Sequence, residues 1–318
     1  MKRILAFFLT VCLLTACSTP QASPTTETTL AQPPLLGLCI RDRDKDPAYY
    51  DALEQLLRDA GYRLSVADSQ NDQSRQDSLI AGMVQEGCAL ILSEPVMVSA
   101  QETVLHTTAQ LPLLLMNYQP EAAVLESRQN LAYIGCDPAE AAILQSQAAA
   151  LLPDGGDLNG DGLISYAILT GPEDHLDAQL HMKGAQWETG ELLATEYTDW
   201  TSQQGQAACS RLLSQYGLDL EVILCGNPAL AQGALQAVED RGWRAGQDGY
   251  LLALGSNDEI PSLILQGGIA STVIPDTQAQ LNLILQTAEQ MLAGIQPEAV
   301  TYTPYITVTA DNATEYLP

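Results

Sequence analysis

The chain has 318 residues, and 39 acidic against 13 basic side chains give it a formal net charge of −26. This excess of acid argues against a nucleic-acid partner and against a protein that lies on an anionic lipid surface. The length exceeds what one hydrophobic core normally serves, so two domains are expected. The seven cysteines show no CxxC or other metal spacing. Cys39, Cys88 and Cys225 fall in or beside apolar runs and are interpreted as core residues.

The first residues have the pattern of a secretory leader. Two basic residues precede an apolar run at 4–14, which is too short to span a membrane. The sequence LTAC that ends at Cys17 resembles a bacterial lipobox, which implies cleavage before Cys17 and a lipid on its sulfur. An ordinary signal peptide with an unrelated cysteine is the alternative. We predict a signal peptide at 1–16, and a lipidated Cys17 with a flexible Ser/Thr/Pro-rich linker at 17–34.

From residue 35 onward, short apolar runs alternate with amphipathic stretches. The first run, LLGLCI, predicts a strand, and the stretch at 48–61 has the periodicity of a helix that ends at Gly61. The alternation continues through the chain and is typical of α/β domains whose parallel sheets are covered by helices. The further predicted strands lie at 62–68, 88–93, 111–117, 131–137, 164–171, 221–227, 250–258 and 270–276.

Several of these predicted strands end in polar side chains. Ligands of parallel sheets bind at the carboxyl ends of the strands. A single polar strand end is ordinary loop chemistry, but several in one chain predict a lined cleft. The residues concerned are Ser93, Asn117, Asn227 and Asn257.

The stretch DLNGDGLIS at 157–165 has most of the pattern of a calcium-binding loop. Side-chain oxygens stand at positions 1, 3 and 5, glycine at 6, a backbone carbonyl at 7 and a hydroxyl at 9. An EF-hand places a glutamate at position 12, where this chain has Ile168 inside a strand-like run. Two interpretations stay open at this point: a calcium site completed from elsewhere in the chain, and a metal-free turn rich in Asp and Asn.

Four stretches together resemble one known family. They are ADSQNDQSRQ at 67–76, AYIGCDPAEAAILQ at 132–145, the DLNGDG loop, and HLDAQLHMKG at 175–184. In this order and spacing they are similar to the periplasmic galactose/glucose-binding proteins, which have the type I periplasmic binding fold. The resemblance covers nearly all of 35–318. It implies two Rossmann-like α/β domains with parallel sheets, joined by a three-crossover hinge that bends around one bound sugar.

The resemblance also implies where the domains begin and end. We expect an amino-terminal domain at 35–135 plus 277–298, and a carboxyl-terminal domain with the calcium loop at 136–276 plus 299–318. The crossovers between them are expected near 135–137, near 274–277 and at about 296–301.

The resemblance offers a closing ligand for the calcium loop. In the family, a glutamate from a different strand supplies the last carboxylate, and Glu221 stands at that position here. The family has glutamine where this chain has Ser165, so a weaker site is expected. Structural calcium would pin the loop to a core strand. The implied ligands are Asp157, Asn159, Asp161, the carbonyl of Leu163, Ser165 and Glu221.

Part of the family's sugar pocket carries over to this chain. His175 and Asp177 match a His-x-Asp that follows a Thr-Gly turn, and Asn227 matches an asparagine at a strand end. Trp200 matches a stacking tryptophan, although by its pattern alone it is equally consistent with a core residue. Carboxylates accept from sugar hydroxyls, amides donate and accept, and an indole covers the C–H face of the ring.

Other pocket positions depart from the family. His181 stands in place of an arginine, Ser93 of an asparagine, Asn257 of an aspartate and Pro275 of an asparagine. The first-domain acid is Asp44 or Asp46, and the first-domain aromatic ring is Tyr49 or Tyr50, since both phenylalanines lie in the leader. The sugar is therefore expected to differ from free glucose or galactose.

These features predict a monomeric, extracytoplasmic solute-binding protein, lipid-anchored to the membrane, that delivers a small sugar or glycoside to the permease of an ABC importer. A surface sensor that presents its ligand to a membrane receptor is the alternative. An enzyme on the same fold is less favoured, because the chain has no GxSxG, HExxH or GxxxxGK[ST] motif. A DNA-binding repressor of this superfamily is excluded by the leader and the charge.

Overall fold

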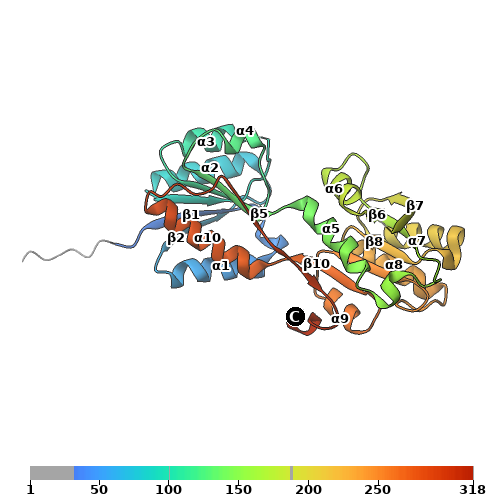
Figure 1. Ribbon diagram of the computed structural model, residues 1–318. Coiled ribbons are helices and arrows are strands. Elements are labelled where there is room, and N and C mark those ends of the chain that lie inside the picture. The colour runs from blue at the N-terminus through green and yellow to red at the C-terminus, as the bar shows by residue number, and fades with distance from the viewer. Residues whose placement is uncertain (1–31, 100, 187–188, 318) are drawn as a thin grey trace, which may run out of the picture. The chain divides into compact units, whose positions relative to one another are not determined.

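The computed structural model describes residues 32–317 except 100, 187 and 188 (Figure 1). The predicted leader, Cys17 and most of the linker lie outside the described residues. Within the described part of the chain, no helix is long and apolar enough to cross a membrane. The described chain forms two α/β lobes, each built on one six-stranded sheet.

The amino-terminal lobe contains an all-parallel sheet with the strand order β11-β5-β4-β3-β1-β2. Its central strands are apolar on both faces because helices cover both faces. Helices α1 and α10 pack on one face, and α2, α3 and α4 on the other. The strands are β1 (Leu35–Ile40), β2 (Arg63–Asp68), β3 (Leu90–Ser93), β4 (Leu113–Met116), β5 (Leu131–Cys136) and β11 (Val300–Thr303), and the helices are α1 (Pro47–Asp59), α2 (Gln73–Gln85), α3 (Glu102–Thr107), α4 (Ala122–Leu125) and α10 (Thr277–Leu292).

The carboxyl-terminal lobe repeats this plan with the order β12-β10-β9-β8-β6-β7, in which only the β10–β12 pair is antiparallel. Helices α7, α8 and α9 contribute to the core on one face, and α5 on the other. The strands are β6 (Ile164–Thr170), β7 (Gly190–Tyr197), β8 (Val222–Cys225), β9 (Tyr250–Leu254), β10 (Ser271–Pro275) and β12 (Tyr305–Val308), and the helices are α5 (Pro138–Ala149), α6 (Leu176–Gly184), α7 (Ser202–Tyr216), α8 (Pro228–Asp240) and α9 (Ile260–Leu265).

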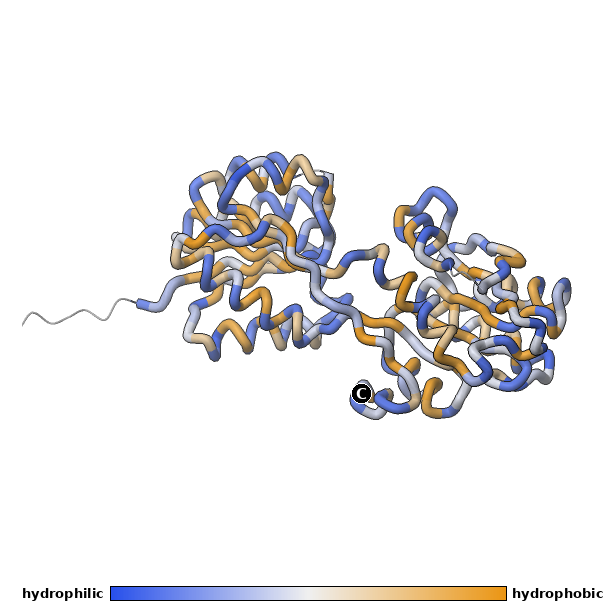
Figure 2. The backbone as a smooth tube through the Cα atoms, viewed as in Figure 1, coloured by the Kyte–Doolittle hydropathy of each residue, from blue (hydrophilic) through white to orange (hydrophobic). Residues whose placement is uncertain are grey.

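The cores of the lobes consist of the apolar runs that predicted the strands. Figure 2 shows hydrophobic residues concentrated along the strands and hydrophilic residues on outer helix faces and loops. The predicted core cysteines Cys39, Cys88 and Cys225 are buried, and none of them forms a disulfide within the described part of the chain. Burial raises the pKa of the Cys39 thiol to about 12, so this thiol stays protonated at neutral pH.

The chain crosses between the lobes three times. The first crossing follows Cys136 at the end of β5, and the second lies between Pro275 at the end of β10 and Thr277 at the start of α10. The third comes at Pro304, between β11 and β12. The prediction that 299–303 belongs to the carboxyl-terminal domain is wrong, because β11 pairs in parallel with β5 of the amino-terminal sheet. Proline has no backbone N–H to continue a ladder, so one apolar stretch is divided between two sheets.

Candidate functional site

Five of the predicted ligand-binding residues line one cavity at the strand ends of the carboxyl-terminal lobe. They come from the turn after β6, from α6, from the turn before α7 and from the end of β8. This is the edge of a parallel sheet where ligands collect. The residues are His175, Asp177, His181, Trp200 and Asn227.

The His175–Asp177 pair forms the start of α6. His175 is the N-cap residue, and its Nδ1 accepts a hydrogen bond of 3.2 Å from the backbone N–H of Asp177. The same Nδ1 lies 3.7 Å from a carboxylate oxygen of Asp177. Both side chains are at least half exposed, at 50 % and 67 %. Capping thus uses one ring nitrogen of His175 and leaves the Asp177 carboxylate accessible as an acceptor.

The Trp200 indole lies against the strand ends and next to His175. The two rings meet edge to face, with centroids 5.8 Å apart and an interplanar angle of 79°. Trp200 has φ +69°, a left-handed conformation that is unusual for a bulky residue. The indole packs on the core and also lines the cavity, and its stacking on a ligand stays a prediction.

Asn227 connects the Trp200 backbone to helix α8. Its Nδ2 donates to the carbonyl of Trp200 at 3.0 Å, and its Oδ1 accepts from the backbone N–H of Leu230 at 2.7 Å, which caps α8. An amide has two N–H donors and two lone pairs on its oxygen. One donor and one lone pair therefore remain for a ligand.

His181 is part of the cavity wall, but its ring is fully engaged. It is 3 % exposed, and its nitrogens lie 3.2 Å from Thr170 Oγ1 and 2.9 Å from Gln145 Oε1. Burial lowers its pKa to about 4, so the ring is neutral at pH 7. The expectation that His181 binds the ligand is corrected, because neither nitrogen is left for one and it brings no positive charge.

A second cavity lies at the ends of β3, β4 and β5 and is also bordered by Pro275 and Tyr305 of the carboxyl-terminal lobe. Of the residues predicted there, Asp46 and Tyr49 line it. Asp44 is exposed in the short helical turn Arg43–Lys45 and lines neither cavity, so Asp46 is the better placed acid. Ser93 is fully buried and lines neither cavity, because it belongs to β3 and its neighbour Glu94 occupies the strand end.

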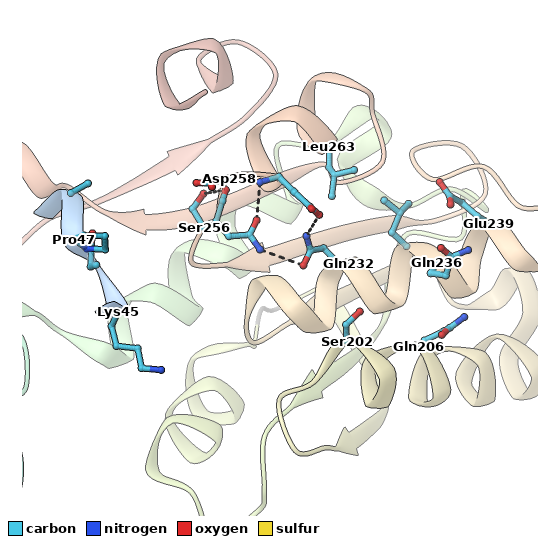
Figure 3. A pocket seen from close by; sticks show the side chains of 15 residues that line it. Lys45, Pro47, Ser202, Gln206, Gln232, Gln236, Glu239, Ser256, Asp258 and Leu263 are labelled. Carbon is cyan, nitrogen blue, oxygen red and sulfur yellow. Dashed lines mark hydrogen bonds between the residues drawn. The ribbon is translucent and has the colours of Figure 1, made fainter. Parts of the chain in front are cut away.

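Asn257 lines neither of these two cavities but borders a third, drawn in Figure 3, which shares Lys45 with both. Its Oδ1 accepts from the backbone N–H groups of Glu259 and Ile260, at 3.0 and 3.1 Å, at the start of α9. Its Nδ2 donates to Gln232 at 3.3 Å. The strand ends earlier than predicted, at Leu254, and Gly255 with φ +75° turns the chain. In this structure Asn257 serves as a local cap, and its ligand role stays a prediction.

Several lining residues were missed in the sequence. The pattern of polar strand ends identified Asn117, but its neighbours carry no pattern of their own. Strand positions predict which segment reaches the sheet edge, whereas loop conformation decides which side chain enters the cavity. The missed residues of this second cavity include Glu94, Tyr118, Gln280 and Tyr305.

Glu221 reaches the loop at 157–165, as the resemblance implied. The carboxylate is 1 % exposed; its Oε1 accepts from the backbone N–H groups of Leu158 and Asn159, and its Oε2 from that of Ser165. Asp157 in turn accepts from the backbone of Gly160, Asp161 and Gly162. Within the described part of the chain, no three Asp, Glu, His or Cys side chains lie close enough together to hold a metal ion. The donor set nevertheless has the hard oxygen chemistry that calcium prefers.

Comparison with known proteins identifies the family. A model of the periplasmic binding protein domain matches residues 46–296. The chain belongs to this family. The resemblance inferred from the sequence and the predicted fold of two α/β domains are thereby confirmed.

Two curated relatives of this family member cover most of its length. The D-galactose/methyl-galactoside binding periplasmic protein MglB of Haemophilus influenzae is 26 % identical over 278 residues, which are 81 % of this chain and 83 % of the relative. The D-ribose/D-allose-binding protein of Pseudomonas aeruginosa is 26 % identical over 254 residues, or 76 % of each chain.

Solved structures show the same fold. A solute binding protein of Bacillus halodurans with bound myo-inositol has a TM-score of 0.68 at 20 % identity, covering 91 % of this chain and 99 % of its own. A solute binding protein of Actinobacillus succinogenes with bound D-allose has a TM-score of 0.71 at 16 % identity. The match covers 89 % of this chain and 100 % of that protein.

Proposed function

We propose that this protein is an extracytoplasmic solute-binding protein that captures a small carbohydrate and delivers it to an ABC importer. The observation that carries the proposal is the grouping of His175, Asp177, Trp200 and Asn227 around one cavity at the strand ends. The family membership and the names of the two curated relatives, which are both sugar-binding proteins, support it.

The grouped side chains match the chemistry of a sugar. The Asp177 carboxylate accepts from hydroxyls, Asn227 offers one donor and one acceptor, and the Trp200 indole provides an apolar face for the C–H side of a pyranose or furanose. Hydrogen bonds to a charged acceptor contribute about 1.5–3 kcal/mol each. Binding needs no nucleophile or base, and we regard the protein as a binder and not as an enzyme.

Structural calcium in the loop at 157–165 is part of the proposal. Asp157, Asn159 and Asp161 would supply side-chain oxygens, Leu163 its carbonyl, and Glu221 the closing carboxylate, with Ser165 reaching the ion through water. The approach of Glu221 to this loop supports the assignment. The bound ion would offset the repulsion between the carboxylates and fix the loop to the sheet.

The proposed function also includes attachment to the membrane. We propose that Cys17 carries the lipid and that the segment at 17–34 tethers a monomeric binding domain beside the permease. The LTAC sequence before the Ser/Thr/Pro-rich stretch supports this.

A sugar panel tests the function directly. The soluble domain is titrated calorimetrically with D-glucose, D-galactose, methyl β-D-galactoside, D-ribose, D-allose and myo-inositol. We expect at least one sugar to bind, with glucose and galactose bound more weakly than the preferred one. Tight binding of an amino acid or a nucleoside, with no sugar bound, would contradict the function and leave the fold unaffected.

A further inference from the structure

The Tyr118 ring lies at the sheet edge of the amino-terminal lobe and borders both cavities. It follows β4 and lines the cavity of Trp200 as well as that of Tyr49. Its exposure is 45 %, whereas Tyr49 and Tyr50, the rings expected to face the ligand, are 6 % and 3 % exposed. An aromatic platform for a sugar has to present a ring face to the cavity. Tyr118 meets this condition, and the two buried tyrosines do not.

Two neighbouring residues, Asn117 and Arg41, fix the orientation of the Tyr118 ring. Asn117 has φ +63°, and this left-handed residue turns the chain directly before Tyr118. The guanidinium carbon of Arg41 lies 4.0 Å from the ring centroid, and Arg41 Nε donates to Asn71 Oδ1 at 2.8 Å. A cation held over one face fixes the ring plane. The other face is the one that a ligand can cover.

Glu94 lies next to this ring as a fixed acceptor. The side chain is 4 % exposed and accepts hydrogen bonds from the Tyr50 hydroxyl, from Asn117 Nδ2 at 3.1 Å and from the backbone N–H of Arg41 at 3.4 Å. Asn117 is held in turn by Gln280, whose Nε2 donates to its Oδ1 at 2.6 Å. A carboxylate has about four acceptor sites, so one of them remains for a ligand hydroxyl.

The Tyr49 hydroxyl is a second, independent indication that this cavity binds a ligand. The residue lines the same cavity as Glu94, and its buried hydroxyl makes no hydrogen bond to any described residue. Buried polar groups in folded proteins are almost always paired, with protein, ligand or water. Burial raises the pKa of this hydroxyl, so it stays protonated and can donate.

We infer that the amino-terminal lobe binds the sugar through Tyr118 as the stacking face and through Glu94 and Tyr49 as acceptor and donor. The inference rests on the proposed function and names the half of the site that faces Trp200 and Asp177. It also limits the ligand to an uncharged sugar or polyol. The Asp, Glu, Lys and Arg side chains that line the two cavities are Asp46, Glu94 and Asp177 with Lys45, an excess of acid that repels sugar acids and sugar phosphates.

Calorimetric titration of Tyr118 variants tests the stacking face. The probes are the six panel sugars, measured with wild type, Tyr118→Ala, Tyr118→Phe and the control Tyr197→Ala, which removes a ring of similar exposure, 42 %, from β7. For every sugar that wild type binds, we expect Tyr118→Ala to weaken binding about tenfold or more, which is about 1.4 kcal/mol. Tyr118→Phe should stay within about threefold, since the ring face is kept. Tyr197→Ala should bind like wild type.

Glu94→Gln tests the acceptor, and D-galacturonate tests the charge of the ligand. We expect Glu94→Gln to weaken binding about tenfold at an unchanged circular-dichroism spectrum, because a charged acceptor becomes a neutral one. D-galacturonate should bind at least about tenfold more weakly than D-galactose, or show no binding at all. Equal affinity for the two sugars overturns the limit to uncharged ligands.

The outcomes separate this inference from the proposed function. Unchanged affinity in Tyr118→Ala or in Glu94→Gln, together with loss of binding in Trp200→Ala, overturns the corresponding contact while the function stands. If wild type binds none of the six sugars, the proposed function fails, and the inference fails with it.

Discussion

Gly171 and the indole of Trp200 are in such close contact that no other residue fits at position 171. A Cβ placed on Gly171 would lie 1.9 Å from Trp200 Cε2 and 2.3 Å from Nε1. The backbone of Gly171 does not have a positive φ, so the constraint is the close approach and not the conformation. The Trp200 ring therefore has its position only because residue 171 carries no side chain.

We expect Gly171→Ala to displace Trp200, because a methyl group cannot share that space. Overpacking of this kind costs about 1–3 kcal/mol of unfolding free energy. Sugar affinity should fall as well, since the stacking face moves. Urea denaturation and calorimetric titration measure the two effects.

Gly82→Ala in α2 is the matched control for this variant. A Cβ on Gly82 meets no atom within 4 Å, so alanine in that helix should stabilise by about 0.5–1 kcal/mol. Equal effects of the two substitutions would show that the contact between Gly171 and Trp200 does not matter.

Asp177→Asn should weaken sugar binding by about 1.5–3 kcal/mol, because a charged acceptor at the start of α6 becomes a neutral amide. Trp200→Ala should cost a similar amount by deleting the apolar face. Isothermal titration with the preferred sugar gives both values. The control is Asp311→Asn, which changes the same charge at an exposed position that lines neither cavity. An Asp177 variant that binds like the Asp311 variant would remove Asp177 from the site.

Calcium added to chelator-stripped protein should raise the melting temperature, since an ion that binds only the folded state stabilises it by mass action. At a calcium concentration of one hundred times Kd this amounts to about 2.7 kcal/mol. Glu221→Gln should lower the calcium affinity, because the closing ligand loses its charge. Differential scanning fluorimetry with and without calcium decides this, and magnesium serves as the control ion. A melting temperature of the stripped wild type that calcium leaves unchanged would count against the site.

Cys17→Ser should prevent lipidation, so the protein should appear in the medium or remain as an uncleaved precursor. Each acyl chain contributes about 0.8 kcal/mol per buried CH₂, and two or more chains hold a protein firmly at the membrane. Fractionation and mass spectrometry of the amino terminus measure this outcome, and Cys136→Ser serves as a matched control at a cysteine inside the fold. Normal processing and unchanged membrane association in Cys17→Ser would leave only an ordinary signal peptide.

The sequence predicts the central strands well, because burial on both faces makes them continuous apolar runs. The edge strands β7, β11 and β12 are less buried and more polar, and the apolar pattern does not reveal them. The first two crossovers are also readable, since β5 and β10 each end beside an aspartate that caps the next helix, Asp137 and Asp276. The third is not, because Tyr302 and Tyr305 belong to one apolar stretch that two different sheets share.

The residues of the candidate site also differ in how well the sequence predicts them: those of the carboxyl-terminal lobe follow from local patterns, and Tyr118 of the amino-terminal lobe does not. His175 and Asn227 are the N-cap residues of α6 and α8, and Asp177 lies in the first turn of α6, so local sequence determines their place. Tyr118 owes its direction to a left-handed residue before it and to a cation from another strand end, which no local pattern contains.

His181 predicts a specific dependence of stability on pH. Its folded-state pKa is lowered from 6.5 to about 4 by burial, so between these values the unfolded chain binds a proton that the native protein does not. The neutral ring's contribution is therefore fully present above pH 6.5 and is lost as the pH falls toward 4. His181→Gln should flatten the decrease in unfolding free energy over this range, at some cost in stability at pH 7. Urea denaturation at pH 7.5, 6, 5 and 4 measures it. His106→Gln, at an exposed histidine of α3, should leave the pH profile unchanged, and a His181→Gln profile parallel to that of wild type would show that the buried ring titrates normally.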